Sequence, residues 1–146
     1  MKKTILMAYV VIGLVFVSTA QKYKIGLNPA LGGFVFQLSA DKKHGLVAET
    51  KDIKGKWTFY AANEIMKLSC VHSSVGAKFL NWRLPTKDEL SDMYSQKDAI
   101  GGFAGEYWSS SEGPGNSAWV MVISEAWGIG QEPKDSLYRV RAVRAF

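Results

Sequence analysis

The order of apolar and polar residues along the chain predicts short strands around a few helices. Runs rich in β-branched and aromatic residues predict strands at 33–39, 44–49, 107–111, 118–124 and 138–146. Turn residues at 41–45 join the first two as a hairpin, and the glycine- and proline-containing segment 113–117 predicts another turn. Because the helical patterns lie between these groups of strands, the sequence predicts the α+β class, with an antiparallel sheet and two helices.

Two segments have the signals of a helix start. Thr58 is placed to cap a helix running to about Leu68, whose apolar residues recur at helical spacing. Thr86 followed by Glu89 is a capping box, in which each side chain satisfies a backbone amide of the other residue. It predicts a helix over 87–96 with Leu90 on its buried side.

Two other segments, 69–81 and 125–136, show no regular period and are expected to be irregular. In the final strand, alternation places Arg139 and Arg141 on one face. Arg144 falls out of phase with them, so we expect a β-bulge there.

The first 20 residues have the features of an export signal. Lys2 and Lys3 precede an apolar run over 4–17, and small residues at 18–20 follow it. This is the pattern of a secretory signal peptide cleaved after Ala20, with an uncleaved membrane anchor as the alternative. We therefore expect a signal peptide at 1–20, a lead-in at 21–31, one domain at 32–146, and a secreted or cell-surface location.

Composition adds limits on function. Loss of Lys2 and Lys3 with the leader lowers the net charge from +5 to +3, so nucleic acid is not an expected partner. The length suits one domain rather than a multidomain enzyme. Cys70 is the sole cysteine, which excludes an internal disulfide, and it is expected to be a small buried side chain.

The residues that carry most enzyme chemistry are few and scattered. His44 and His72 are in unrelated segments without partners at metal-ligand spacing, and both are expected in turns or surface loops. The sequence shows neither a nucleophile elbow around Ser109–Ser111 nor a phosphate-binding glycine loop. We therefore expect no enzyme activity, no metal and no cofactor.

The segment from Gly113 to Tyr138 is the best candidate for a binding surface. It combines turns, mixed polarity and Trp127 between glycines, in a chain whose flanking parts are well patterned. Loops on a rigid scaffold commonly carry binding residues, and aromatic side chains supply large contact areas. The alternative for Trp127 is that it folds back onto the core.

Five sequence strings occur in an order that resembles a known family. They are HGLVA (44–48), NWRLPTKDEL (81–90), KDAIGGF (97–103), YWSSSE (107–112) and the ending RVRAVRAF (139–146). Together they are similar to the Lcl C-terminal domain family, and the resemblance covers about 32–146. It implies a C-type-lectin-like fold, akin to the formylglycine-generating enzymes, in an adhesive or ligand-binding module exported to the bacterial surface.

Some members of that family resemble the variable proteins of diversity-generating retroelements, in which the segment before the final strand lines the ligand site. The corresponding positions here imply a ligand-binding set of Gly113, Asn116, Ser117, Val120, Val122, Ser124, Glu125, Trp127, Ile129, Gln131, Lys134, Asp135 and Tyr138, with Pro114 and Gly115 in the same turn. Adenine changes in the usual asparagine codon do not yield glutamate, tryptophan or lysine. Glu125, Trp127 and Lys134 therefore favour a member that is not diversified.

Two departures from related proteins limit what the resemblance implies. Calcium-dependent lectins use a Glu-Pro-Asn motif, whereas Glu132-Pro133-Lys134 has a cation where the asparagine ligand would be. We therefore expect no calcium site. Formylglycine-generating enzymes need a pair of cysteines, so their chemistry does not transfer to a chain with Cys70 alone.

The sequence thus supports three functions. The first is an exported, adhesin-like module that recognises a protein or glycan through 113–138, with the basic surplus favouring an anionic glycan. The second is a homo-oligomeric tip or accessory subunit of a surface fibre, in which the same segment contacts a neighbouring subunit. The third and least favoured is an enzyme acting on the cell envelope.

Overall fold

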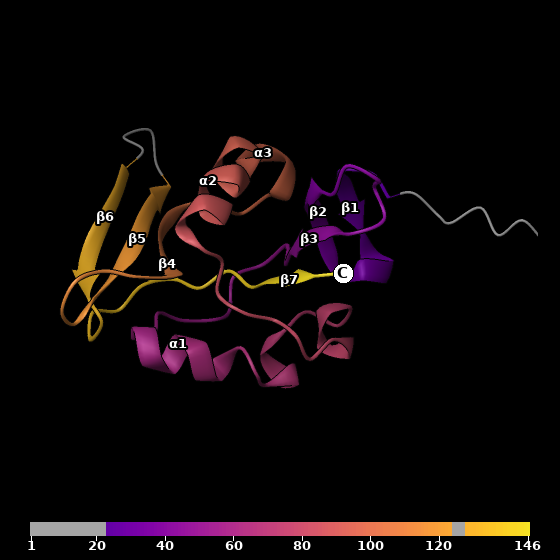
Figure 1. Cartoon of the computed structure of the whole chain (residues 1–146). Coiled ribbons are helices and arrows are strands. Elements are labelled where there is room, and N and C mark those ends of the chain that lie inside the picture. Colours follow the sequence, from indigo (N-terminus) through magenta and orange to yellow (C-terminus); the bar gives the residue numbers. More distant parts are fainter. Residues whose placement is uncertain (1–22, 124–127) are drawn as a thin grey trace, which may run out of the picture.

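The computed structural model describes residues 23–123 and 128–146, which form a small α+β domain. The predicted α+β class is confirmed, but the strands form two antiparallel sheets at opposite sides of the domain (Figure 1). The first sheet has the order β1-β2-β3-β7 and the second the order β4-β5-β6. The strands are β1 (Gly26–Asn28), β2 (Gly33–Leu38), β3 (Gly45–Ala48), β4 (Gly105–Glu112), β5 (Ser117–Ile123), β6 (Gly128–Pro133) and β7 (Val143–Ala145).

The first predicted hairpin is present as β2 and β3. The segment expected as a lead-in contributes β1 and a short 3-10 helix, Pro29–Leu31, and β1 pairs with β2. At Gly33 the backbones of β2 and β3 approach so closely that a Cβ would overlap the carbonyl oxygen of Ala48. The predicted leader, 1–20, lies outside the described residues.

The helices follow their predicted starts more closely than their predicted ends. Thr58 caps α1 (Phe59–Ile65) through its hydroxyl, but α1 stops before Leu68. The segment expected to be irregular, 69–81, contains two 3-10 helices, Ser69–Val71 and Gly76–Lys78. Both bonds of the predicted capping box begin α2 (Lys87–Ser95), which is followed by the short α3 (Lys97–Ile100). No described helix is long and apolar enough to cross a membrane.

The predicted irregular segment 125–136 is wrong in its middle, because β6 occupies 128–133. Its glycines and proline obscure any alternation in the sequence, whereas β5 supplies the pairing partner along the whole strand. The predicted strand 138–146 is also interrupted: bridges occur at Tyr138 and Arg139, and the regular strand β7 is only 143–145. Contacts with distant segments therefore determine where β6 and β7 begin and end.

The C-terminal segment 138–146 joins the two sheets. On one side it hydrogen-bonds to segment 49–57, for example from Ile53 N–H to the carbonyl of Val140. On the other side Trp108 N–H donates to the carbonyl of Arg139. This segment runs between α1 on one side and α2 with α3 on the other (Figure 1).

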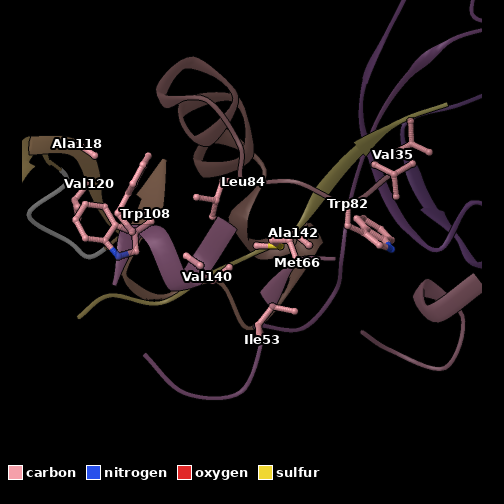
Figure 2. Close-up of a cluster of buried hydrophobic side chains, with 13 residues drawn as sticks. Val35, Ile53, Met66, Trp82, Leu84, Trp108, Ala118, Val120, Val140 and Ala142 are labelled. Carbon is pink, nitrogen blue, oxygen red and sulfur yellow. The ribbon is translucent and has the colours of Figure 1, made fainter. Parts of the chain in front are cut away.

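Two buried clusters stabilise this arrangement. In Figure 2, Val140 and Ala142 of the C-terminal segment lie between Trp108 of the second sheet and Trp82 near the first. The second cluster places Leu90 and Met93 of α2 against strands of both sheets, as the helical spacing predicts. Each cluster contains residues of both sheets or of the elements beside them, so the two clusters together hold the second sheet against the rest of the domain.

Candidate functional site

The predicted ligand-binding positions are distributed over the turn before β5, over β5 and β6, and over the chain that follows. The turn positions Gly113, Asn116 and Ser117 are half-buried or exposed, as are Ile129 and Gln131 of β6. Asp135 is exposed, and Val122 and Tyr138 are half-buried. Ser124, Glu125 and Trp127 lie outside the described residues.

Two predicted positions are not accessible. Val120 is 3% exposed and packs with Trp108 in the core, on the inner face of the second sheet. Lys134 is 6% exposed, and its ammonium group lies over the rings of Phe59 and Tyr60, at 5.1 and 5.6 Å from their centres. A ligand cannot contact either side chain in this conformation.

Three of the accessible positions, Gly113, Asn116 and Ser117, lie at the turn between β4 and β5, beside the start of α1. Asn116 Oδ1 accepts a hydrogen bond of 3.1 Å from the hydroxyl of Tyr60, which is 59% exposed. The Ser117 hydroxyl donates to the carbonyl of Pro114, which closes the turn. We call the exposed groups of Tyr60, Glu112, Asn116 and Ser117 the turn surface.

Lys134 supports the turn surface from beneath. Its ammonium group donates to Oε2 of Glu112, whose side chain is 63% exposed, and its backbone N–H donates to the carbonyl of Asn116. The hydrogen bond to Glu112 raises the pKa of Lys134, so the lysine keeps its charge over the physiological pH range. Lys134 therefore orients two of the four surface residues instead of facing the ligand.

Two members of the turn surface are not among the predicted positions. Tyr60 is adjacent to the buried side of α1, which is formed by Phe59, Ala62 and Met66. The sequence signal for its exposure is that this aromatic residue does not share the helical spacing of the buried three. Glu112 is the last residue of β4, and no local sequence pattern predicts its ion pair with Lys134. Tyr60 reaches Asn116 through the packing of α1 on the second sheet, whereas Glu112 is close to Asn116 because it ends the strand that leads into the same turn.

Tyr138 has a structural position at the inner face of the same sheet. Its ring contacts Trp108 edge to face, with ring centres 5.0 Å apart. Burial, followed by the nearby carboxylates of Glu132 and Glu106, raises the pKa of Tyr138. The phenol is thus a neutral hydrogen-bond donor near two carboxylates, at the junction of the sheet and the C-terminal segment.

The prediction for Cys70 is wrong, whereas His72 lies in a loop as predicted but has a buried side chain. The His72 side chain is 1% exposed and stacks on Trp82, and its two ring nitrogens contact Glu49 Oε2 at 3.0 Å and the carbonyl of Met66 at 2.9 Å. Glu49 also accepts from the backbone N–H of Ser73. Cys70, by contrast, is exposed, because its short 3-10 helix lies on the surface. A buried histidine needs a long-range partner, which local sequence does not reveal.

A buried network holds the loop after α3 in place. Arg141 is fully buried, and its guanidinium donates to Asp52 Oδ1 at 2.7 Å and to the carbonyl of Gly102 at 2.8 Å. The Tyr107 hydroxyl donates to Asp52 Oδ2, and burial together with that carboxylate raises its pKa to about 12. All these groups are satisfied by one another, which is typical of a structural network.

A pocket of about 440 Å³ lies next to this loop, at the opposite end of β5 from the turn surface. Its lining is Lys97, Asp98, Gly101, Gly102, Phe103, Ala104 and Ile123. It contains none of the predicted binding positions. In the described part of the chain, no three histidine, cysteine, aspartate or glutamate side chains converge on a point where a metal could bind.

Comparison with known proteins gives no family assignment. No family model matches the chain, and no curated protein matches it. The interpretation of the site therefore depends on its geometry.

Proposed function

We propose that this protein is an exported, surface-associated binding module that recognises a glycan or a protein loop through the turn surface. The observation that carries the proposal is the convergence of Tyr60 from α1 with Asn116 and Glu112 from the β4–β5 hairpin on one exposed and internally hydrogen-bonded surface. Binding sites commonly combine an exposed aromatic ring with polar groups held by a rigid scaffold. The leader at 1–20 supports export.

The contacts already made within the surface define what remains for a ligand. Asn116 Oδ1 is used by Tyr60, which leaves the amide hydrogens of Asn116 as donors. Glu112 Oε2 is used by Lys134, which leaves Oε1 as an acceptor. A donor and an acceptor side by side suit ligand hydroxyls or peptide groups, and the exposed carboxylate favours an uncharged ligand over the anionic glycan suggested by composition.

The finer fold assignment also belongs to this proposal. We propose a C-type-lectin-like domain, because the first and last described strands, β1 and β7, belong to one sheet, while the described parts of 113–138 lie in and beside the other. The five ordered sequence strings support the same assignment. The turn surface has no arrangement of acid, base and nucleophile, so the proposal assigns it binding without catalysis.

The proposal is tested by screening the purified protein on arrays of oligosaccharides and of extracellular-matrix proteins. For a ligand identified in this way, Tyr60→Ala and Asn116→Ala should each raise the dissociation constant by at least about tenfold, because each removes a central contact. The matched control is Leu80→Ala, because Leu80 is 81% exposed but lies near the first sheet. Unchanged melting temperatures would separate contact loss from unfolding.

Unchanged affinity of both surface variants would overturn the assignment of the turn surface. Equal weakening by Leu80→Ala would overturn it as well, because the effect would then not be local. Failure of every oligosaccharide and matrix protein to bind at millimolar concentration would count against the binding function itself.

A further inference from the structure

Strand β6 lies at the open edge of the second sheet. The strand order is β4-β5-β6, so β6 pairs on one side only, and Figure 1 shows no described segment beyond it. All six of its residues are paired in register with β5, from Ser117 opposite Pro133 to Val122 opposite Gly128. Such an edge presents unpaired backbone groups to a strand of another molecule.

One hydrogen bond determines which groups face outward. Lys134 N–H donates to the carbonyl of Asn116 at 3.0 Å, just beyond the Ser117–Pro133 pair. In an antiparallel ladder that bond makes Ser117–Pro133 a non-hydrogen-bonded pair, and the pair types then alternate along the strand. Gly128, Gly130 and Glu132 therefore bond to β5, while the N–H and C=O groups of Ile129 and Gln131 point to the free edge.

We propose that β6 pairs antiparallel with β6 of a second copy of this chain, about a two-fold axis at Gly130. In this register Ile129 of each copy lies opposite Gln131 of the other and exchanges both backbone hydrogen bonds with it. Every outward N–H and C=O of these two residues then has a partner. The second sheet becomes one continuous sheet across two molecules.

The side chains of β6 fit this symmetric register. Gly130 meets its own copy at the axis, where it has no side chain to clash. Glu132 lies opposite Gly128 of the other copy, so no two carboxylates are placed directly opposite each other. Beyond it, Pro133 has no N–H and its carbonyl already accepts from Ser136, which ends the ladder.

A shifted register leaves an outward backbone group of β6 without a hydrogen-bond partner. An axis at Gln131 would place Ile129 opposite Pro133, whose missing N–H leaves the Ile129 carbonyl unpaired. With the axis at Gly130, the outward backbone groups of Ile129 and Gln131 are thus complementary to those of a second β6, which favours a second copy over an unrelated strand. The edge also lacks the lysines that commonly protect an exposed strand from pairing.

The proposal is tested by comparing Gln131→Pro with Gln131→Ala in sedimentation equilibrium of the full chain. Both variants remove the side chain, but only proline removes the outward N–H, which the fold itself does not use. The wild-type chain and Gln131→Ala should dimerise, whereas Gln131→Pro should weaken dimerisation by at least about tenfold. Circular dichroism would verify that all three chains are folded.

Amide hydrogen exchange gives an independent measurement on the unmodified chain. In a dilute sample the amides of Gly130 and Glu132 should be protected and those of Ile129 and Gln131 exposed. At high concentration all four should be protected. A chain that stays monomeric at about 1 mM, fast exchange of Ile129 and Gln131 in a dimer, or equal dimerisation of both Gln131 variants would overturn the proposal.

This pairing is separate from ligand binding at the turn surface. Tyr60→Ala removes an exposed contact of the turn surface but no backbone group of β6, so it should leave the dimer unchanged. A protein that dimerises but binds no ligand would refute the proposed function alone. A monomer that binds its ligand would refute the pairing alone.

Discussion

The two ends of the molecule use polar residues in opposite ways. Around the first sheet and the C-terminal segment, Glu49, Arg141 and Arg144 are buried and bonded to backbone groups of distant segments. At the outer end of the second sheet, Glu112 and Asn116 are exposed and keep free hydrogen-bonding atoms. Exposure therefore distinguishes the charged Glu112 of the turn surface from charged residues that hold the fold together, such as Arg141.

The arginines of the final strand illustrate the difference. Arg144 stacks on Phe79, at 3.5 Å from its ring centre, and donates to the carbonyl of Leu31. Arg141 connects Asp52 to the loop after α3. Part of the positive charge that composition alone associates with a binding surface thus belongs to the architecture.

The largest effect is expected from Arg141→Met. It leaves the Asp52 carboxylate and several carbonyl groups without their buried donor, so the free energy of unfolding should fall by about 3 kcal/mol or more. Arg139→Met is the matched control, because Arg139 contacts the same carboxylate at 3.5 Å but is 45% exposed, and should cost less than about 1 kcal/mol. Urea denaturation measures both, and equal losses would remove the distinction between buried and exposed arginines.

What could be predicted from sequence follows from how local each interaction is. The capping box of α2 and the first hairpin depend on residues close together in the chain, and both are present where predicted. The Arg141–Asp52 pair spans 89 residues, and no neighbouring residue indicates it. Strand β6 is stabilised by its pairing with β5 rather than by its own glycine-rich sequence, so the pattern of residues in 128–133 was not enough to predict a strand.

The candidate site shows the same limit. The turn 113–117 was identifiable because glycine, proline and asparagine favour turns. The contributions of Tyr60 and Lys134 depend on α1 packing against the turn, which joins residues more than fifty positions apart. Sequence could place part of the turn surface, but not the Tyr60 side chain that completes it or the Lys134 side chain that supports it.

A smaller effect is expected from a pair of glycine substitutions, one in each region. A Cβ on Gly76 would overlap Glu49 Oε1, and this carboxylate is held in place by Ser73 at Oε1 and His72 at Oε2, so Gly76→Ala should cost about 1–3 kcal/mol. A Cβ on Gly130 meets nothing within 4 Å, so Gly130→Ala should change stability by less than about 0.5 kcal/mol. Thermal unfolding of dilute samples measures both, and a larger loss at Gly130 would contradict the open position of β6.

The smallest expected effect is a difference in alkaline stability between the wild-type chain and Tyr107→Phe. The pKa of Tyr107 is raised from 10.0 to about 12 by burial and by Asp52, so the unfolded chain loses this proton first as the pH rises. The stability that depends on the protonated phenol is complete below pH 10 and is lost as the pH approaches 12. After allowance for solvent screening, this loss should be about 1–2 kcal/mol.

Tyr107→Phe has no phenol to ionise, so its free energy of unfolding should not show this loss between pH 10 and 12. At neutral pH the variant is less stable than the wild-type chain, because Asp52 loses a hydrogen bond. Other lysines and tyrosines, including Tyr138 at the second sheet, titrate in both chains and cancel when the two curves are subtracted. Urea denaturation at closely spaced pH values from 9 to 12 provides the comparison. Parallel curves would mean that solvent reaches the phenol, and the buried network around Arg141 would then be as open to water as the turn surface.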